Sequence, residues 1–160
     1  MTPEIIQIKA KVLVGMKLEM DLMDNKTELL WQRFSPRMKN IPYSIPELKY
    51  SLQIYPDDYF KQFKPDMRFV KWAAVEVFKT DGIPAEMEVL TLEAGLYAVF
   101  HYKGSGKDHS IFQYIYSQWV PNSKFTLDNR PHFEVLGKNY SNTSAASEED
   151  IYIPIKVKMD

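Results

Sequence analysis

Alternating apolar and polar residues predict three strands in the first half of the chain. Residues 11–21 and 48–55 have the period of two that is typical of half-buried strands. Residues 68–78, RFVKWAAVEVF, form a more apolar third strand. The alternation begins with the first residues of the chain, so the N-terminal segment is interpreted as a strand and not as a signal peptide.

A helix is predicted between the first two strands. It begins near Asn25, which is a good N-cap residue, and extends towards Asn40. Leu30 and Phe34 lie four residues apart and belong to one apolar face. Pro36 is expected to kink the helix or to end it early, because proline lacks the N–H that the helix needs there.

The second half of the chain repeats this order. It contains a long strand at 87–102, a helix at about 108–120 and strands at 131–137 and 149–158. Each half is therefore one strand-helix-strand-strand unit.

The two helices share a motif. WQRFSP at 31–36 and YSQWVP at 116–121 have the common spacing aromatic-x-x-aromatic-x-Pro. We therefore predict an α+β fold with a pseudo-two-fold axis, an antiparallel sheet and both helices on one face. The predicted domain covers 1–160, with repeats at about 4–80 and 86–158.

Composition narrows the possible functions. Twenty basic and twenty-one acidic residues are interspersed and leave a formal net charge of −1, which disfavours nucleic acid as a partner. The chain has no cysteine, and its three histidines lack metal-ligand spacing, so we expect neither a metal site nor a cofactor.

No apolar run is long enough to span a membrane, and a cytoplasmic location is expected. Aromatic residues make up 14% of the chain, which indicates that some rings line a site.

The strand HFEVLG contains the strongest candidate residue. Alternation places His132, Glu134 and Leu136 on one face, and Phe133 and Val135 on the other. If Phe133 and Val135 pack under the helices, Glu134 faces away from them. On a fully exposed sheet the Glu134 carboxylate would simply be solvated.

The last strand, DIYIPIKV, also has two different faces. Asp150 and Tyr152 alternate with Ile151 and Ile153, and the isoleucine face is expected to point to the core. Glu134, Asp150 and Tyr152 would then share an open face of the sheet.

The first half offers counterparts to these residues. Gln53 and Tyr55 lie on the polar face of their strand, and Gln53 matches Glu134 under the duplication. Trp72 lies beside the small Ala74, which suits a flat ligand. Together the two open faces would form a central groove with aromatic walls, which favours a flat or cationic organic guest.

These features resemble a known family. The duplicated order, the HFEVLG strand and the closing EEDIYIPIKV are similar to the effector-binding domain of AraC- and MerR-type multidrug-sensing regulators and of DNA gyrase inhibitor-like proteins, over about 4–158. The resemblance implies two pseudo-symmetric halves around a drug-binding groove whose basal carboxylate is Glu134. Asp150 and Tyr152 match family positions, although glutamate is more usual than aspartate there. Family regulators carry a helix-turn-helix unit ahead of this domain, so we interpret the chain as a stand-alone form.

The leading hypothesis is that the chain binds a small hydrophobic or cationic aromatic molecule and is not an enzyme. The resemblance also implies two alternatives. One is a hydrolase of reactive electrophilic compounds, in which Glu134 acts as general acid or base. The other is a protein-interaction module such as an inhibitor of gyrase. The expected ligand-binding residues are Glu134, Tyr152, Trp72, Tyr55, Asp150, Gln53 and Leu136.

Overall fold

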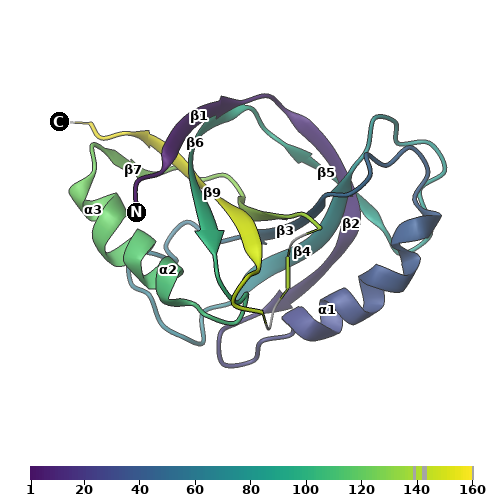
Figure 1. The fold of residues 1–160 in the computed structure, drawn as a ribbon, viewed down its shortest axis with the longest axis horizontal. Helices are drawn as coiled ribbons and strands as arrows, with labels where there is room; N and C mark the ends of the chain where they lie inside the picture. The colour runs from purple at the N-terminus through teal and green to yellow at the C-terminus, as the bar shows by residue number, and fades with distance from the viewer. Residues whose placement is uncertain (139, 142–143, 160) are drawn as a thin grey trace.

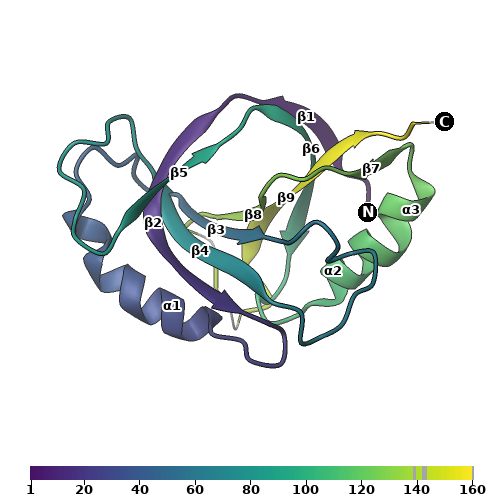
Figure 2. The same ribbon diagram turned by 180° about the vertical axis from the view of Figure 1, so that it is seen from behind.

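The computed structural model describes residues 1–138, 140–141 and 144–159. Within these residues an antiparallel sheet of nine strands curls into a half-barrel, with the helices on its outside (Figures 1 and 2). The strands are β1 (Glu4–Ile8), β2 (Lys11–Met20), β3 (Lys49–Ile54), β4 (Phe69–Glu76), β5 (Glu88–Leu92), β6 (Gly95–Lys103), β7 (Phe125–Leu127), β8 (His132–Leu136) and β9 (Glu148–Val157). The helical segments are α1 (Thr27–Phe34) with a 3-10 extension (Ser35–Asn40), and α2 (Ser110–Tyr114), a π turn (Ile115–Trp119) and α3 (Val120–Asn122).

The order of the strands is symmetric. It is β1-β6-β9-β8-β3-β4-β2-β5, with β7 paired to β9 outside this path. Exchanging β1 with β5, β2 with β6, β3 with β8 and β4 with β9 gives the same order read from the opposite edge of the sheet. The pseudo-two-fold axis passes between β3 and β8, which pair antiparallel at the centre. The predicted pseudo-symmetry is thus confirmed, while the boundaries of the domain and of its repeats stay a prediction.

Both helices pack on the same face of the sheet. Residues directly opposite each other in neighbouring strands share a face. One row of such partners crosses five strands: Ala73, Ser51, Glu134, Ile151 and Phe100. Ala73 shares a buried cluster with Phe34 of α1, and Ile151 shares one with Ile115 beside α2. Trp31 and Trp119 pack against these clusters, so the predicted placement of both helices is confirmed.

The opposite face forms the inside of the half-barrel. Leu13, Leu52, Trp72, Tyr97 and Phe133 belong to a single buried cluster there. The sheet therefore has an apolar core on each side, one under the helices and one inside the curl.

Some element boundaries differ from the predictions. The strand expected at 87–102 is divided into β5 and β6, and β1 and β7 are separate short strands. Helix α1 starts after Lys26, because the Asn25 side chain accepts the N–H of Thr27 and forms a turn before the helix. The α-helical part ends before Pro36, as proline requires.

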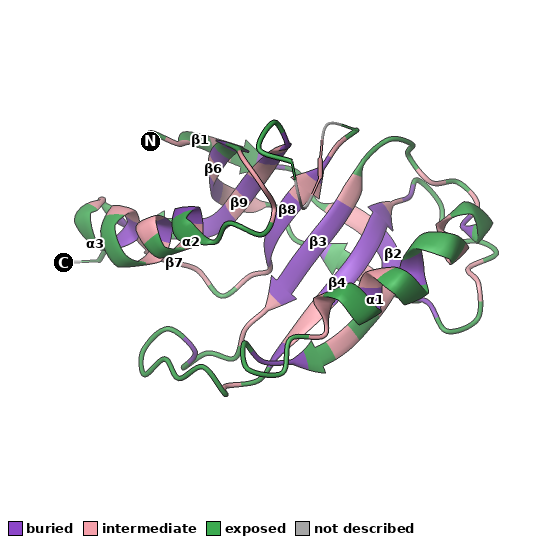
Figure 3. Cartoon of the chain, turned by 60° about the horizontal axis from the view of Figure 1, so that its bottom comes forward, coloured by how far each residue is buried: buried purple, intermediate pink, exposed green. Residues whose placement is uncertain are grey.

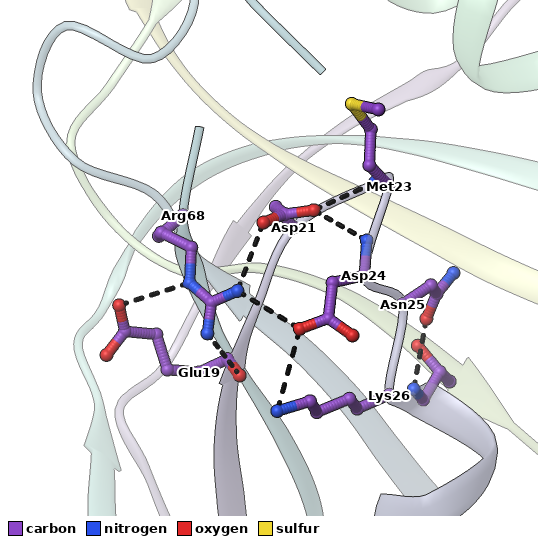
Figure 4. A network of polar contacts seen from close by, with 8 residues as sticks. Glu19, Asp21, Met23, Asp24, Asn25, Lys26 and Arg68 are labelled. Carbon is purple, nitrogen blue, oxygen red and sulfur yellow. Dashed lines mark hydrogen bonds and ion pairs between the residues drawn. The ribbon is translucent and has the colours of Figure 1, made fainter. Parts of the chain in front are cut away.

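A polar network holds the turn between β2 and α1 (Figure 4). The Asp21 carboxylate accepts hydrogen bonds from the backbone N–H groups of Met23 at 2.9 Å and Asp24 at 2.6 Å. It also accepts a hydrogen bond from Nη1 of Arg68 at 3.0 Å. The hydrogen bond from Asp24 is the main reason why the pKa of Asp21 is lowered, and Arg68 adds to this effect. The ionised carboxylate therefore stabilises this turn.

We expect Asp21→Asn to lower the melting temperature at pH 7, because the amide cannot replace the charge beside Arg68. The pKa of Asp21 is lower in the folded state than in the unfolded chain. Its stabilisation is therefore complete above the unfolded value of about 4, and it is lost as the pH falls through the folded pKa. Thermal unfolding between pH 2 and 7 should show the variant approaching wild type at the acid end. The exposed Asp81→Asn serves as the control, and a difference for Asp21→Asn that does not change with pH would contradict the assignment.

Candidate functional site

The strands β3, β4 and β8 run between α1 and α2 on the helix-bearing face (Figure 3). A row of polar side chains lies on this face of the three strands. Ser51, Gln53, His132 and Glu134 are each between 4% and 8% exposed. Gln53 is paired with His132 on one side and with Lys71 on the other, and Ser51 is paired with Glu134. We call these five residues the polar strip. Burial of so many polar groups side by side is costly, which makes the strip the candidate functional site.

Glu134 and Lys71 are the charged members of the polar strip. Burial raises the pKa of Glu134, while the Lys71 charge and hydrogen bonding by Gln53 act in the opposite direction. Burial also lowers the pKa of Lys71, opposed by the charges of Glu134 and Glu149. No ion pair of 4.0 Å or less joins Lys71 to either carboxylate among the described residues. The opposite charges thus influence each other without direct contact.

Glu149 is a second buried carboxylate at this site. It lies near the start of β9, is 9% exposed and faces the same side of the sheet as Ile151. Burial, followed by repulsion from Glu134, raises the pKa of Glu149 to about 7. Glu149 also lines a surface cavity of about 300 Å³ together with Glu47, Glu148, Asp150, Lys138 and His101. The lining residues Val135, Asp150 and His101 lie on the inner face, so the cavity opens on the side of the sheet opposite to the Glu149 side chain.

Aromatic rings cover the His132 end of the polar strip. Phe60, in the loop after β3, stacks on Tyr116 at 4.7 Å and on His132 at 5.4 Å between ring centroids. The Tyr55 ring contacts His132 edge-on at 4.9 Å. The Tyr116 hydroxyl forms a 2.7 Å hydrogen bond with Nδ1 of His132. A loop of the first half thereby closes onto a helix of the second half.

The covering rings and His132 are uncharged near neutral pH. Burial raises the pKa of Tyr55 and of Tyr116 well above the ordinary value, and the charge of Glu134 contributes to both shifts. Burial, with a smaller effect of Arg130, lowers the pKa of His132 to about 3. The electrostatics of the site are therefore set by Glu134, Lys71 and Glu149.

The predicted site residues are divided between the two faces of the sheet. Glu134 pairs with Ile151 on the helix side, whereas Tyr152 pairs with Phe133 on the inside. The prediction that Glu134, Asp150 and Tyr152 share a face is therefore wrong. It assumed that only one face is apolar, but Ile151 and Phe133 both pack in cores, on opposite sides. The helix side has Glu134, Gln53, Tyr55 and Leu136, and the inner face has Trp72, Tyr152 and Asp150.

The inner-face residues have structural contacts of their own. Trp72 is 4% exposed within the inner core. The Tyr152 ring stacks on Phe133 at 4.5 Å with an interplanar angle of 12°. Asp150 binds Nδ1 of His101 at 2.7 Å and raises the pKa of that histidine. Trp72 and Tyr152 therefore lie on the opposite side of the sheet from the polar strip.

Sequence reasoning missed Lys71, Glu149, Phe60, Tyr116 and His132 as site residues. Lys71 carried a usable signal, because it is a charged residue within the apolar strand RFVKWAAVEVF. Tyr116 belongs to the duplicated aromatic motif, which indicates two equivalent helices but no site. The others have no local signal, because their neighbours come from distant segments.

The described part of the chain contains no group of three or more His, Asp or Glu residues arranged to hold a metal ion. Likewise, none of its helices is long and apolar enough to cross a membrane.

Comparison with known proteins identifies the class. The model of the family Cass2, integron-associated effector binding protein, matches residues 4–155. The chain belongs to this family of effector-binding proteins. A search of the curated proteins found no match.

Solved structures share the fold. SAV2435 bound to tetraphenylphosphonium is 20% identical, with a TM-score of 0.72 over 98% of this chain and 94% of that one. EcmrR in its complex with DNA is 17% identical, with a TM-score of 0.71 over 98% of this chain and 58% of that one. A hydrolase from Listeria innocua is 12% identical, with a TM-score of 0.62 over 97% and 92%. The predicted α+β class, with two helices, a curled antiparallel sheet and a groove, is confirmed.

Proposed function

We propose that the chain binds a hydrophobic or cationic aromatic small molecule on the helix-bearing face, with Glu134 at the base of the site. The observation that carries this proposal is the buried carboxylate of Glu134, whose pKa is raised by burial, on the same face of the sheet as the aromatic rings around His132. The tetraphenylphosphonium bound to SAV2435, a protein of the same fold, supports an aromatic cation as the ligand class.

The physical reason to expect a cation at this site is the cost of burying the Glu134 carboxylate. An ionised group removed from water is stabilised by an opposite charge nearby, and Lys71 is not close enough to form a direct ion pair with Glu134. The electron-rich faces of Tyr55, Phe60 and Tyr116 add attraction for a cation and surface for stacking. An aromatic cation therefore satisfies the charge and the rings together.

Binding at Glu134 requires a local rearrangement. The Phe60 ring stacks on Tyr116 and on His132 at one end of the strip, but it remains 36% exposed. It lies in the connection between β3 and β4, which can move without breaking the sheet. A guest that displaces Phe60 recovers the stacking area on Tyr116.

We expect Glu134→Gln to weaken binding of tetraphenylphosphonium by roughly 1–3 kcal/mol, the usual effect of losing a charge-assisted contact. The melting temperature should stay unchanged or rise, because a buried charge is removed and Glu149 still neutralises Lys71. Calorimetric titration and thermal unfolding of both proteins measure the two effects.

The control is Glu88→Gln on the exposed surface of β5, which should retain wild-type affinity. Unchanged cation affinity together with a lower melting temperature in Glu134→Gln would make Glu134 a structural residue and would refute the proposed site.

Hydrolysis of a reactive electrophilic compound is the second candidate function. The observation in its favour is that burial raises the pKa of Glu134, which suits a general acid or base. Release of nitrophenol from p-nitrophenyl acetate, compared between wild type and Glu134→Gln, tests it. Equal rates for the two proteins would exclude Glu134 as the catalytic group for this ester.

A further inference from the structure

The Phe60 ring is enclosed by four other rings. It stacks on Tyr116, with the ring centroids 4.7 Å apart and the planes inclined by 30°, and on His132, at 5.4 Å and 20°. Tyr55 and Tyr59 each meet it edge-on, at 5.0 Å between centroids. We call these four rings the aromatic box. Stacked and edge-on contacts are the favourable geometries for aromatic pairs, so the box is shaped to hold one flat ring.

The box is built on fixed elements, whereas the ring that fills it lies in a loop. Tyr55 directly follows β3, His132 begins β8 and Tyr116 lies in the π turn. Tyr59 is buried in a small apolar cluster of its own. Phe60 lies in the connection between β3 and β4 and keeps exposed surface. Removal of its ring from the box therefore requires no separation of strands.

A hydrogen bond also holds this loop to the second half of the chain. Nδ2 of Asn129, in the connection between β7 and β8, donates to Oδ1 of Asp57 at 2.7 Å. The contact is exposed, so water competes for both groups and the net stabilisation is small. The closed position of Phe60 thus depends on weak contacts that a bound molecule can replace.

The charges around the box do not select a charged ring. His132 is uncharged near neutral pH, and its Nδ1 is hydrogen-bonded to the Tyr116 hydroxyl. The negative charge of Glu134 acts on Tyr55 and Tyr116, while the positive charge of Arg130 acts on His132. Because these two influences have opposite signs, an uncharged aromatic ring suits the box best.

We propose that Phe60 is an internal competitor: in the free protein its ring fills the subsite that receives an uncharged aromatic ring of the bound molecule. This inference rests on the proposed function and deepens it, because it specifies where a ring of the ligand lies and which side chain it replaces. A residue that only formed a wall of the site would behave in the opposite way. Its removal would take contact area away from the ligand.

Phe60→Ala distinguishes a competitor from a wall. The probe is N-phenyl-1-naphthylamine, which is uncharged at pH 7 and fluoresces more strongly in apolar surroundings. We expect its dissociation constant to fall by roughly tenfold in Phe60→Ala, because the two stacked contacts of Phe60 no longer have to be given up. Phe60→Trp should weaken binding instead, since a larger ring competes better for the box.

Phe63→Ala is the matched control, because it removes the same kind of ring from the same loop. Within the part of the chain that the structure describes, the only ring contact of Phe63 is with Tyr59, at 5.5 Å. This variant should therefore keep the wild-type affinity.

A second measurement uses the wild-type protein and does not depend on the folding of a variant. Nuclear Overhauser contacts between the Phe60 and Tyr116 rings should be present in the free protein. On saturation with the probe they should be replaced by contacts between the probe and Tyr116.

The outcomes separate this inference from the proposed function. Equal or lower affinity in Phe60→Ala, an equal gain in Phe63→Ala, or Phe60–Tyr116 contacts that persist in the saturated protein would each overturn the inference and leave the proposed function standing. Failure of both wild type and Phe60→Ala to bind either the probe or tetraphenylphosphonium would overturn the proposed function, and the inference with it.

Discussion

Trp72→Ala is expected to destabilise the fold by about 3–5 kcal/mol, the usual cost of removing a large aromatic side chain from a core. Trp72 is 4% exposed and packs with Leu52 and Phe133 inside the half-barrel. The sheet closes around it from neighbouring strands and cannot collapse fully into the space left behind. Urea unfolding followed by circular dichroism measures the loss.

Trp31→Ala is the matched control for this substitution. Trp31 is partly buried and contacts Phe34 edge-on at 5.7 Å at the margin of the α1 cluster, so its removal should cost clearly less. The sequence alone suggested that Trp72 stacks on a ligand. Wild-type stability combined with lost ligand affinity in Trp72→Ala would favour that interpretation and contradict its assignment to the core.

Gly15→Ala is expected to cost about 3 kcal/mol, at the upper end of the range for overpacking. Gly15 lies in the middle of β2, between Ala74 of β4 and Glu88 of β5. A Cβ atom on Gly15 would lie 2.7 Å from Cα of Ala74 and would also collide with the carbonyl oxygen of Ala73. These are backbone atoms, which cannot rotate away, so the strands would have to separate where the sheet curls.

Gly137→Ala provides the comparison, since a Cβ at that position meets no atom within 4 Å. It should be neutral or slightly stabilising, because alanine restricts the unfolded chain. Thermal unfolding of both variants is the measurement. Equal melting temperatures for the two variants would show that β2 and β4 can separate at Gly15 without cost.

The Phe60 ring stacks on Tyr116 and His132 at one end of the polar strip. The position of its loop is therefore expected to influence how well a flat guest stacks on these rings.

Local patterns were sufficient to predict the elements and their duplication. Alternation identified β2, β3, β4, β8 and β9 within a residue or two, and the aromatic-x-x-aromatic-x-Pro motif predicted two equivalent helices on one face. These features depend on neighbours a few positions apart, whose spacing is written directly in the chain. Glu134 could be chosen as the candidate carboxylate for a similar reason, because it interrupts an apolar strand.

Alternation within a strand could not show which side of the sheet Glu134 faces. The half-barrel has an apolar core on both sides, so apolar residues at both odd and even positions are buried. The pairing of Glu134 with Ile151, and not with Tyr152, placed the site under the helices and excluded Trp72 from it. Lys71 and Glu149 share a face with Glu134 only because β4 and β9 flank β3 and β8 in the curled sheet. Their charges act across space between residues far apart in the sequence, and a periodic pattern carries no information about such distances.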